Sequence, residues 1–279
     1  MNDSLRTRIE EYYAAVPLLF ADAEEFGSLR LFVRRLPGTP YYGGPGYAQP
    51  VAGHMAAADI ARVRARQREL AVPEAFEWLA ETAPGMRAAI EAAGLPVTER
   101  PLMVLDRRHA IEQGPLPDGV TLRALTADDP ALPAALALPG LAFADEGTAV
   151  GPAGRKELSA AAEEVTADGT LAAARPTITA GHKTVIAAIA ADGTPLAVGQ
   201  YHPAHGTTEI GGIGTLPAAR RQGLAAAVTA ALVTHARTQD VHTVFLAYAL
   251  APVARLYARM GFRPAGITLL IADQPARGA

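Results

Sequence analysis

A predicted strand in this chain leads through a short arginine-containing turn into an apolar helix. Residues 209–226 have the sequence EIGGIGTLPAARRQGLAA. The first amides of a helix have no partner inside the helix, and the helix dipole adds partial positive charge at the same end. Arg220 and Arg221 add fixed charge, and Gly223 allows a phosphate to approach the backbone. We therefore predict an anion site in this turn, with a pyrophosphate as its natural ligand.

Two other kinds of phosphate loop do not fit the chain. A P-loop requires GxxxxGK[ST], and the nearest segment, Gly181-His-Lys-Thr, has Pro176 at the place of the first glycine. A dinucleotide-binding turn requires GxGxxG, and Pro217 stands where the third glycine would follow Gly212 and Gly214. The pyrophosphate is therefore not expected to belong to a P-loop nucleotide or a Rossmann dinucleotide.

Two motifs in this half of the chain resemble signatures of the GNAT acetyltransferase superfamily. Arg220, Gly223 and Ala225 match the pattern [Q/R]-x-x-G-x-[G/A], which holds the pyrophosphate of coenzyme A in that family. Residues 256–262, LYARMGF, are similar to the LYxxxGF element near the end of GNAT domains. The resemblance covers about residues 120–272. It implies an α/β protein with the GNAT fold, a mixed and mostly antiparallel sheet flanked by helices.

The resemblance implies acetyl-CoA as acyl donor and assigns two groups of residues to it. In the family the backbone of the fourth strand pairs with the pantetheine arm, and the corresponding residues here are Ile213, Gly214 and Thr215. The residues expected around the pyrophosphate are Arg220, Arg221, Gln222, Gly223, Leu224, Ala225 and Ala226. Many relatives carry an asparagine seven residues before the tyrosine of the second motif. This chain has Leu250 there, so one cofactor contact is expected to be lost or replaced.

The resemblance also suggests two catalytic residues. Tyr257 matches the tyrosine that often protonates the departing thiolate, and its apolar neighbours allow the alternative that its ring only packs in the core. Glu209 lies at about the offset where some relatives carry a general base, and the alternative is a glutamate that faces solvent or only orients the substrate. His202 and His205 follow the preceding strand and are further candidates for the base.

Composition narrows the class of protein. The chain has 279 residues, no cysteine and a net charge of -3. Disulfides, thiolate metal sites and a cysteine nucleophile are thereby excluded, and no strong positive field is present to recruit nucleic acid. The N-terminus lacks the apolar run of a secretory signal, and the longest apolar run, Leu224–Val233, is about half of a membrane span. We expect a cytoplasmic protein without a membrane or nucleic-acid partner, and the histidines show no metal-ligand spacing, so no metal is expected.

The length favours two domains. We place the boundary in the polar stretch 107–119, which gives a catalytic GNAT domain at 119–279 and an N-terminal domain at 1–112. The N-terminal half resembles, more weakly, the degenerate first half of tandem GNAT proteins. Only about one strand fits after Phe262, whereas GNAT domains usually end with two. We therefore predict strand exchange between the halves, with Leu102–Leu105 or Ile267–Ala272 crossing over.

Local patterns predict the remaining elements of the N-terminal half. Helices are expected over residues 4–16, over 57–70, from Pro73 through Trp78, and from Pro84 to Gly94. Residues 37–50 are rich in glycine and proline and are expected to form a loop, whose tyrosines are Tyr41, Tyr42 and Tyr47. These tyrosines could line a substrate cleft or lie on a plain surface loop. Glu24 and Glu25 are expected on a solvated helix face.

The GNAT resemblance implies an N-acyltransferase that moves an acetyl group from acetyl-CoA to a primary amine of a small molecule in a ternary complex. Two alternatives keep the fold: a non-catalytic acyl-CoA sensor, and an enzyme that uses another acyl donor. A serine hydrolase is excluded, because none of the three serines, Ser4, Ser28 and Ser159, lies in GxSxG. The sequence leaves the acceptor and the oligomeric state open, with a homodimer as one alternative.

Overall fold

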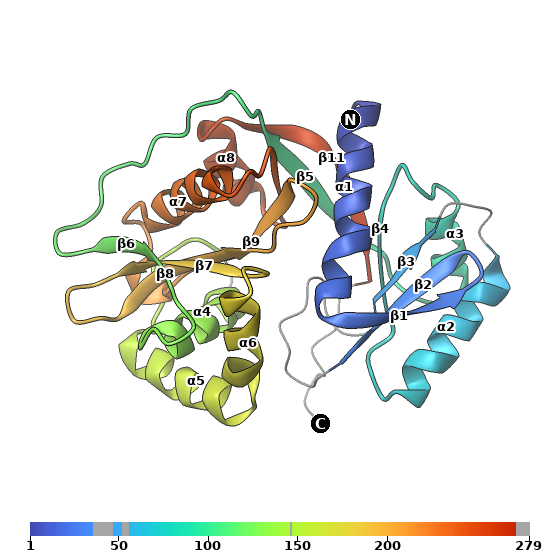
Figure 1. Cartoon of the computed structure of the whole chain (residues 1–279), viewed down its shortest axis with the longest axis horizontal. Helices are drawn as coiled ribbons and strands as arrows, with labels where there is room; N and C mark the ends of the chain where they lie inside the picture. The colour runs from blue at the N-terminus through green and yellow to red at the C-terminus, as the bar shows by residue number, and fades with distance from the viewer. Residues whose placement is uncertain (36–46, 52–55, 146, 272–279) are drawn as a thin grey trace. The chain divides into compact units, whose positions relative to one another are not determined.

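The computed structural model describes residues 1–35, 47–51, 56–145 and 147–271, which form two compact units (Figure 1). The first unit contains the residues up to Leu102 together with those from Pro264 onward, and the second contains Met103–Arg263. Tyr41, Tyr42 and Ala272, on which sequence predictions fall, lie outside the described residues.

The first unit is a sheet covered by helices. Its strands lie in the order β1-β2-β3-β4-β11, and only the β3–β4 pair is parallel among these registers. Its core contains Leu31, Phe76 and Trp78 from the sheet and Ile60 and Ile90 from two helices. The elements are α1 (Asp3–Ala15), the 3₁₀ helix η1 (Val16–Leu19), β1 (Ala21–Phe26), β2 (Leu29–Arg34), β3 (Tyr47–Pro50), α2 (Ala57–Glu69), β4 (Ala75–Leu79), α3 (Met86–Ala92), the start of β5 (Thr98–Leu105) and most of β11 (Phe262–Leu270).

The last strand of the chain belongs to the sheet of the first unit. Thr268 and Leu270 of β11 pair in antiparallel register with Leu79 and Glu77 of β4. The hydroxyl of Thr268 also lies 3.3 Å from that of Tyr13 in α1. The predicted strand exchange is therefore confirmed for the C-terminal segment. The C-terminal segment thereby completes the sheet of the first unit, whereas the described residues of the second unit all lie between Met103 and Arg263.

The structure corrects three predictions in this unit. The segment after Pro73 is not a helix, because Trp78 lies in β4, a strand buried on both faces. A short apolar stretch buried on both faces has no period that separates strand from helix. Glu24 and Glu25 lie in β1 and not on a helix. Tyr47, expected in a loop, is buried in β3.

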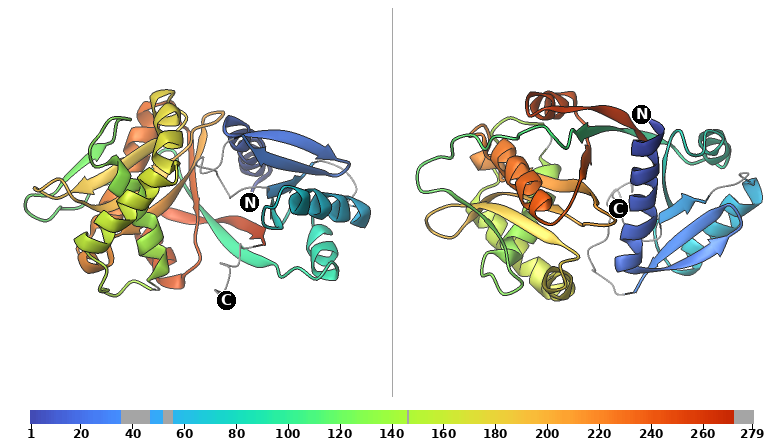
Figure 2. Two further views of the ribbon diagram at one scale, coloured as in Figure 1. Left: turned by 90° about the horizontal axis from the view of Figure 1, so that it is seen from below. Right: turned by 45° about the horizontal axis from the view of Figure 1, so that its top comes forward.

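The second unit carries the predicted motifs. Its strands lie in the order β10-β9-β8-β7-β6, antiparallel except for β9 and β10. Helices α4, α5 and α6 group on one side of this sheet and α7 lies on the other (Figure 1; Figure 2). The elements are the end of β5, β6 (Thr121–Ala124), α4 (Leu132–Ala144), α5 (Arg155–Ala167), α6 (Thr170–Thr179), β7 (Thr184–Ile189), β8 (Pro195–Tyr201), β9 (Thr207–Thr215), the 3₁₀ helix η2 (Pro217–Ala219), α7 (Leu224–Thr238), β10 (Thr243–Ala247) and α8 (Ala251–Arg259).

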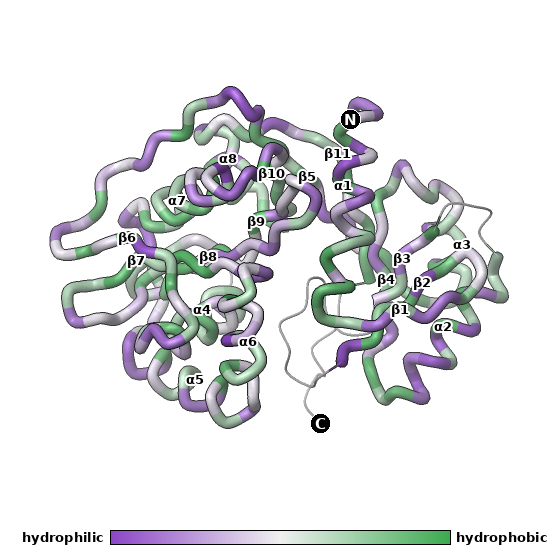
Figure 3. The backbone as a smooth tube through the Cα atoms, in the orientation of Figure 1, coloured by the Kyte–Doolittle hydropathy of each residue, from purple (hydrophilic) through white to green (hydrophobic). Residues whose placement is uncertain are grey.

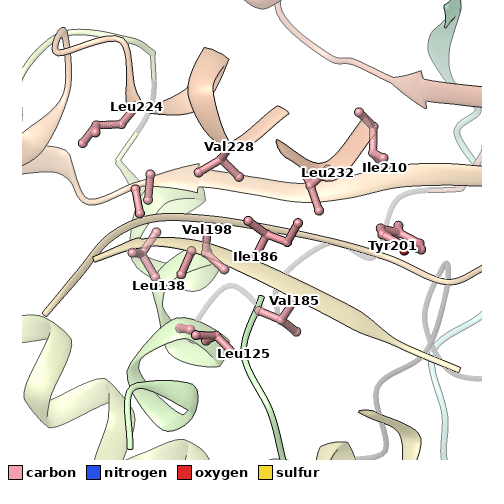
Figure 4. Close-up of a cluster of buried hydrophobic side chains, with 14 of the residues drawn as sticks. Leu125, Leu138, Val185, Ile186, Val198, Tyr201, Ile210, Leu224, Val228 and Leu232 are labelled. Carbon is pink, nitrogen blue, oxygen red and sulfur yellow. The ribbon is translucent and has the colours of Figure 1, made fainter. Parts of the chain in front are cut away.

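The core of the second unit fixes α7 against the sheet. Leu224, Val228 and Leu232 recur every four residues and form one apolar face of α7, which packs on β8 and β9 (Figure 4). Burying each of these side chains stabilises the fold by about 2 kcal/mol. Helices at the surface, such as α2 and α5, alternate hydrophobic and hydrophilic residues (Figure 3). The position of α7 decides where its N-terminus, and the turn before it, present their amides.

Helix α6 was not expected from the sequence. It holds Pro176 in its interior, which normally argues against a helix. It begins at Gly169, a residue with a positive φ of 86°, and its buried side chains include Leu171 and Ala174. Packing of this apolar side therefore outweighs the local signal of the proline.

Candidate functional site

Strands β9 and β10 pair at one end and then separate. Their parallel register joins Thr207 to Thr243 and ends with Glu209 opposite Phe245. Beyond that point β10 ends at Ala247, whereas β9 continues to Thr215 along β8. No further pair joins the two strands within the described residues. The edge of β9 that holds Ile213, Gly214 and Thr215 therefore presents its backbone where another extended chain could add to it.

A β-bulge shapes this stretch of β9. Val198 of β8 pairs with Gly214, but Gln200 pairs with Gly211, so β9 contains one extra residue between these pairs. Gly212 lies in the bulge with a φ of 59°. A bulge bends the strand and redirects its backbone groups, and such bulges occur often beside active sites.

The backbone of Gly214 lies close to α4. A Cβ atom at this position would lie 2.9 Å from the Cβ of Ala142 and 3.1 Å from Leu138. Any larger residue would push α4 away from β9. A glycine is therefore required at this point of the strand edge.

The N-terminus of α7 is open and carries no acidic residue in its first turn. Its first hydrogen bond runs from the amide of Ala227 to the carbonyl of Gly223, so the amides of Leu224, Ala225 and Ala226 have no acceptor inside the helix. Gly223 has a φ of 78°, and a Cβ atom there would meet nothing within 4 Å. The turn and the helix start thus present a group of amides without internal acceptors, of the kind that binds anions.

Arg221 and Arg220 have different environments. Arg221 is exposed and has a left-handed φ of 68°, which costs a non-glycine residue about 1 kcal/mol. The side chain of Arg220 is only 8% exposed. Its guanidinium donates to the Asp145 carboxylate at 2.7 Å and to the carbonyls of Ala142 and Asp145 at 2.8 and 2.9 Å. Arg220 therefore ties the end of α4 to the turn, and Arg221 is the exposed charge beside the amides.

Backbone bonds hold the segment before α5 to the same turn. The amide of Gly151 donates to Pro217, and the amide of Ala218 donates to Ala153, at 3.1 and 3.0 Å. A shallow hollow lies beside them, with Gly154 and Gln222 among its lining residues. The turn before α7 is thus fixed from two sides, which preorganises its amides.

The two predicted catalytic residues are both buried in the second unit. Glu209 occupies the last paired position of β9, with 8% of its surface exposed. Tyr257 lies on α8, 5% exposed, with its ring centroid 5.8 Å from that of Phe262. The ring of Tyr257 therefore packs in the core, as the alternative interpretation expects. Burial raises the pKa of the Tyr257 hydroxyl, so the hydroxyl is protonated at neutral pH and gives up its proton less readily than a free tyrosine.

The two histidines differ in their environment. His205 is exposed, with a φ of 48°. His202 is buried, and its Nδ1 lies 2.9 Å from the carbonyl oxygen of His182, so Nδ1 carries the proton of the neutral ring. Burial, followed by the charge of Lys183, lowers the pKa of His202 to about 3. A histidine that binds protons so weakly is a poor general base at neutral pH.

Two residues at this site were missed from the sequence. Asp145, the partner of Arg220, stands in a segment without a motif. Lys183 is a buried lysine directly before β7, and the sequence shows it only as a lysine next to an apolar strand. The placement of either residue depends on contacts that the fold creates between distant segments.

In the described part of the chain, no group of three or more histidine, aspartate or glutamate side chains could hold a metal ion. None of the helices described is long and apolar enough to cross a membrane.

Comparisons with known proteins identify the fold of this site. Residues 155–262 match the model of the Acetyltransferase (GNAT) family. The chain matches no curated protein sequence. Among solved structures it is similar to a GCN5-related N-acetyltransferase from Kribbella flavida, with a TM-score of 0.71, 18% identity, and coverage of 100% of this chain and 97% of that one.

Two further solved structures share the fold. A tandem GNAT protein from the clavulanic acid biosynthesis pathway has a TM-score of 0.54 and 17% identity, over 88% of this chain and 79% of the other. A GCN5-related N-acetyltransferase from Sphaerobacter thermophilus has the same TM-score and 15% identity, over 87% and 75%. The α/β fold and the GNAT architecture over both halves of the chain are thereby confirmed.

Proposed function

We propose that this chain, whose residues 155–262 match the Acetyltransferase (GNAT) family model, transfers an acetyl group from acetyl-CoA to a primary amine of a small molecule. One observation carries the proposal. The strand edge left open where β9 and β10 separate leads toward the open amides at the start of α7. An extended arm that ends in a diphosphate is complementary to this combination.

Acetyl-CoA would use both parts of the site. Its pantetheine arm would pair with the backbone at Ile213, Gly214 and Thr215, and its pyrophosphate would accept hydrogen bonds from the amides that begin at Arg221 and end at Ala226. Arg221 supplies exposed charge next to these amides. Arg220 contributes by fixing the turn. The bound thioester supplies the activated acyl group.

The residues of the chain supply position and proton transfer. The amine attacks the thioester carbonyl, a C–N bond forms and the C–S bond breaks. Glu209 accepts the proton that the amine loses, and the hydroxyl of Tyr257 gives a proton to the departing thiolate. Holding donor and acceptor together contributes much of the rate. The non-catalytic sensor remains the alternative, and it differs by binding CoA without turnover.

The test combines binding with turnover. Calorimetry of the full chain with CoA measures binding, and release of free thiol in the presence of acetyl-CoA and a panel of amines measures transfer. The chain has no cysteine, so a thiol reagent reports CoA alone. Arg221→Ala should weaken CoA binding, whereas the exposed Arg263→Ala on β11 is the matched control. The proposal fails if folded protein gives no heat with CoA, or if it binds CoA and releases no thiol with any amine.

A further inference from the structure

Three polar side chains occupy neighbouring positions across the ends of three strands. Thr184 of β7 pairs with Tyr201 of β8, and Tyr201 pairs with Ile210 of β9, both in antiparallel register. Lys183 directly precedes β7 and His202 directly follows β8. When the two registers are continued by one residue past these pairs, Lys183 comes next to His202, and His202 next to Glu209. Directly opposite residues of antiparallel strands point to the same face of a sheet. Lys183, His202 and Glu209 thus form a row, which we call the polar row.

The polar row faces away from α7. The hydroxyl of Tyr201 lies 2.8 Å from Nδ1 of His235 in α7, so Tyr201 points toward that helix. Ile210 also lies on that side, near Leu232 (Figure 4). Successive residues of a strand alternate between faces, so the residues next to Tyr201 and Ile210 point to the opposite side.

Lys183 carries a buried charge that lacks an anion. The residue is 3% exposed. Within the described residues, its ammonium group makes neither a hydrogen bond nor an ion pair. Its charge, after burial, also lowers the pKa of His202, as expected for neighbouring positions in the polar row. A buried ammonium without an anionic partner is costly, and buried groups whose pKa is shifted in this way cluster at functional sites.

The other end of the polar row is the point where acyl transfer is proposed. Glu209 occupies the last pair before β9 and β10 separate. Neighbouring strands lie about 4.8 Å apart, so the backbones at the two ends of the row are roughly 10 Å apart. The long lysine side chain shortens the distance that a ligand must span. An acceptor with its amine at Glu209 could therefore reach Lys183 with a second group.

We propose that the acceptor is an amino acid or a similar amine that carries a carboxylate, with the carboxylate bound by Lys183 and the amine at Glu209. The inference rests on the proposed function and names the substrate class of the same site. A carboxylate suits a single ammonium, whereas a phosphate dianion is usually held by several donors or by an arginine fork. Neutral His202 lies between the two charged ends and separates them.

The experiment compares matched acceptors and matched lysine variants. Thiol release is measured with pairs such as phenylalanine and phenethylamine, ornithine and putrescine, or aminohexanoate and pentylamine, whose members differ only by the carboxylate. The variants are Lys183→Met, which removes the charge, Lys183→Arg, which keeps it, and Lys156→Met. Lys156 is the only other lysine and is exposed on α5, so it controls for the substitution itself.

In the wild type, kcat/KM for the carboxylate member of at least one pair should exceed that for the plain amine by about tenfold or more, equivalent to about 1.4 kcal/mol. Lys183→Met should abolish this preference, mainly by raising KM for the carboxylate member. Lys183→Arg should retain part of the preference, and Lys156→Met should leave it unchanged. An enzyme that acetylates plain amines as well as their carboxylate partners, or a Lys183→Met variant that keeps the ratio, overturns the proposal.

A second measurement separates this proposal from the proposed function. Thermal shifts with each acceptor are recorded in the presence of CoA, which cannot transfer an acyl group. Stabilisation by the carboxylate member alone, lost in Lys183→Met, supports the acceptor class even if no thiol is released. Absence of any shift for carboxylate members, in protein that binds CoA, overturns the acceptor class and leaves the cofactor site standing.

Discussion

The guanidinium of Arg220 and the carboxylate of Asp145 lie 2.7 Å apart, although 75 positions separate them in the chain. The same guanidinium also donates to the carbonyls of Ala142 and Ala149. This arrangement makes the motif arginine a structural link between α4 and the turn before α7. Its effect on cofactor binding is then indirect, through the geometry of the amides.

Arg220→Ala should therefore destabilise the fold. It leaves a partly buried carboxylate and several carbonyls without a donor, and a loss of about 2–4 kcal/mol is expected in urea unfolding. Asp145→Asn keeps an acceptor oxygen for the guanidinium and should cost about 1 kcal/mol. CoA affinity should fall with stability in both variants. Full stability of Arg220→Ala together with lost CoA binding would show instead that Arg220 contacts the pyrophosphate directly.

The expected role of Gly223 in phosphate binding can be separated from the effect of its positive φ by comparison with Gly169, a glycine in a similar position. Gly223 and Gly169 are both N-cap residues, with φ of 78° and 86°, and a Cβ atom on either would meet nothing within 4 Å. Replacing either glycine by alanine should lower the free energy of unfolding by about 1 kcal/mol, because a left-handed φ disfavours a residue with a Cβ. Only Gly223→Ala should also weaken CoA binding, measured by calorimetry. Equal CoA affinity of the two variants would contradict a phosphate beside Gly223.

Tyr257→Phe tests the general acid. Removing the hydroxyl keeps the ring against Phe262, so the fold should persist while kcat falls by about 10–100-fold. Because burial raises the pKa of Tyr257, the folded state binds this proton more tightly than the unfolded state. The stability that the neutral Tyr257 hydroxyl contributes is present below the pKa of this group in the unfolded chain. It is lost as the pH rises above about 10. The alkaline loss of stability should be smaller in Tyr257→Phe, and unchanged kcat in this variant would assign the tyrosine to the core alone.

Glu209→Gln tests the general base. The amide keeps the size of the side chain at the last pair of β9 but cannot accept the amine's proton, so kcat should fall by about 100-fold or more. CoA affinity should remain, since the backbone edge and the α7 amides are unchanged. Raising the pH should partly restore the rate by supplying neutral amine. Wild-type kcat in Glu209→Gln at neutral pH would assign the base to another group.

The sequence predicted those parts of the site that depend on adjacent residues. The turn from Arg220 to Gly223 and the LYARMGF segment are local patterns, so both can be recognised along the chain without the fold. The polar row cannot be recognised in the sequence, because it depends on the register of three strands. The partner of Arg220 cannot be recognised either, because α4 must first pack on β9. The helix predicted around Trp78 is a strand, because both faces of β4 are buried and its sequence lacks a clear period of two. The strand exchange was foreseen from the shortage of strands after Phe262 and is confirmed by the β4–β11 register.

The buried charge of Lys183 predicts an unusual dependence of stability on pH. Burial lowers its pKa from 10.5 to about 8, so between these values the unfolded chain binds more protons than the folded one. Folding stability should then rise as the pH increases through this window, and below about pH 8 the full penalty of the buried charge is present. Lys183→Met removes the penalty and should be more stable than the wild type at pH 7, with an advantage that shrinks toward pH 10. Urea unfolding of the wild type and Lys183→Met at pH 7, 8.5 and 10 measures this difference in stability, with Lys156→Met as control. If Lys183→Met is less stable than the wild type at pH 7, then the ammonium has an anionic partner in the folded chain, and the carboxylate of an acceptor is not needed to complete the polar row.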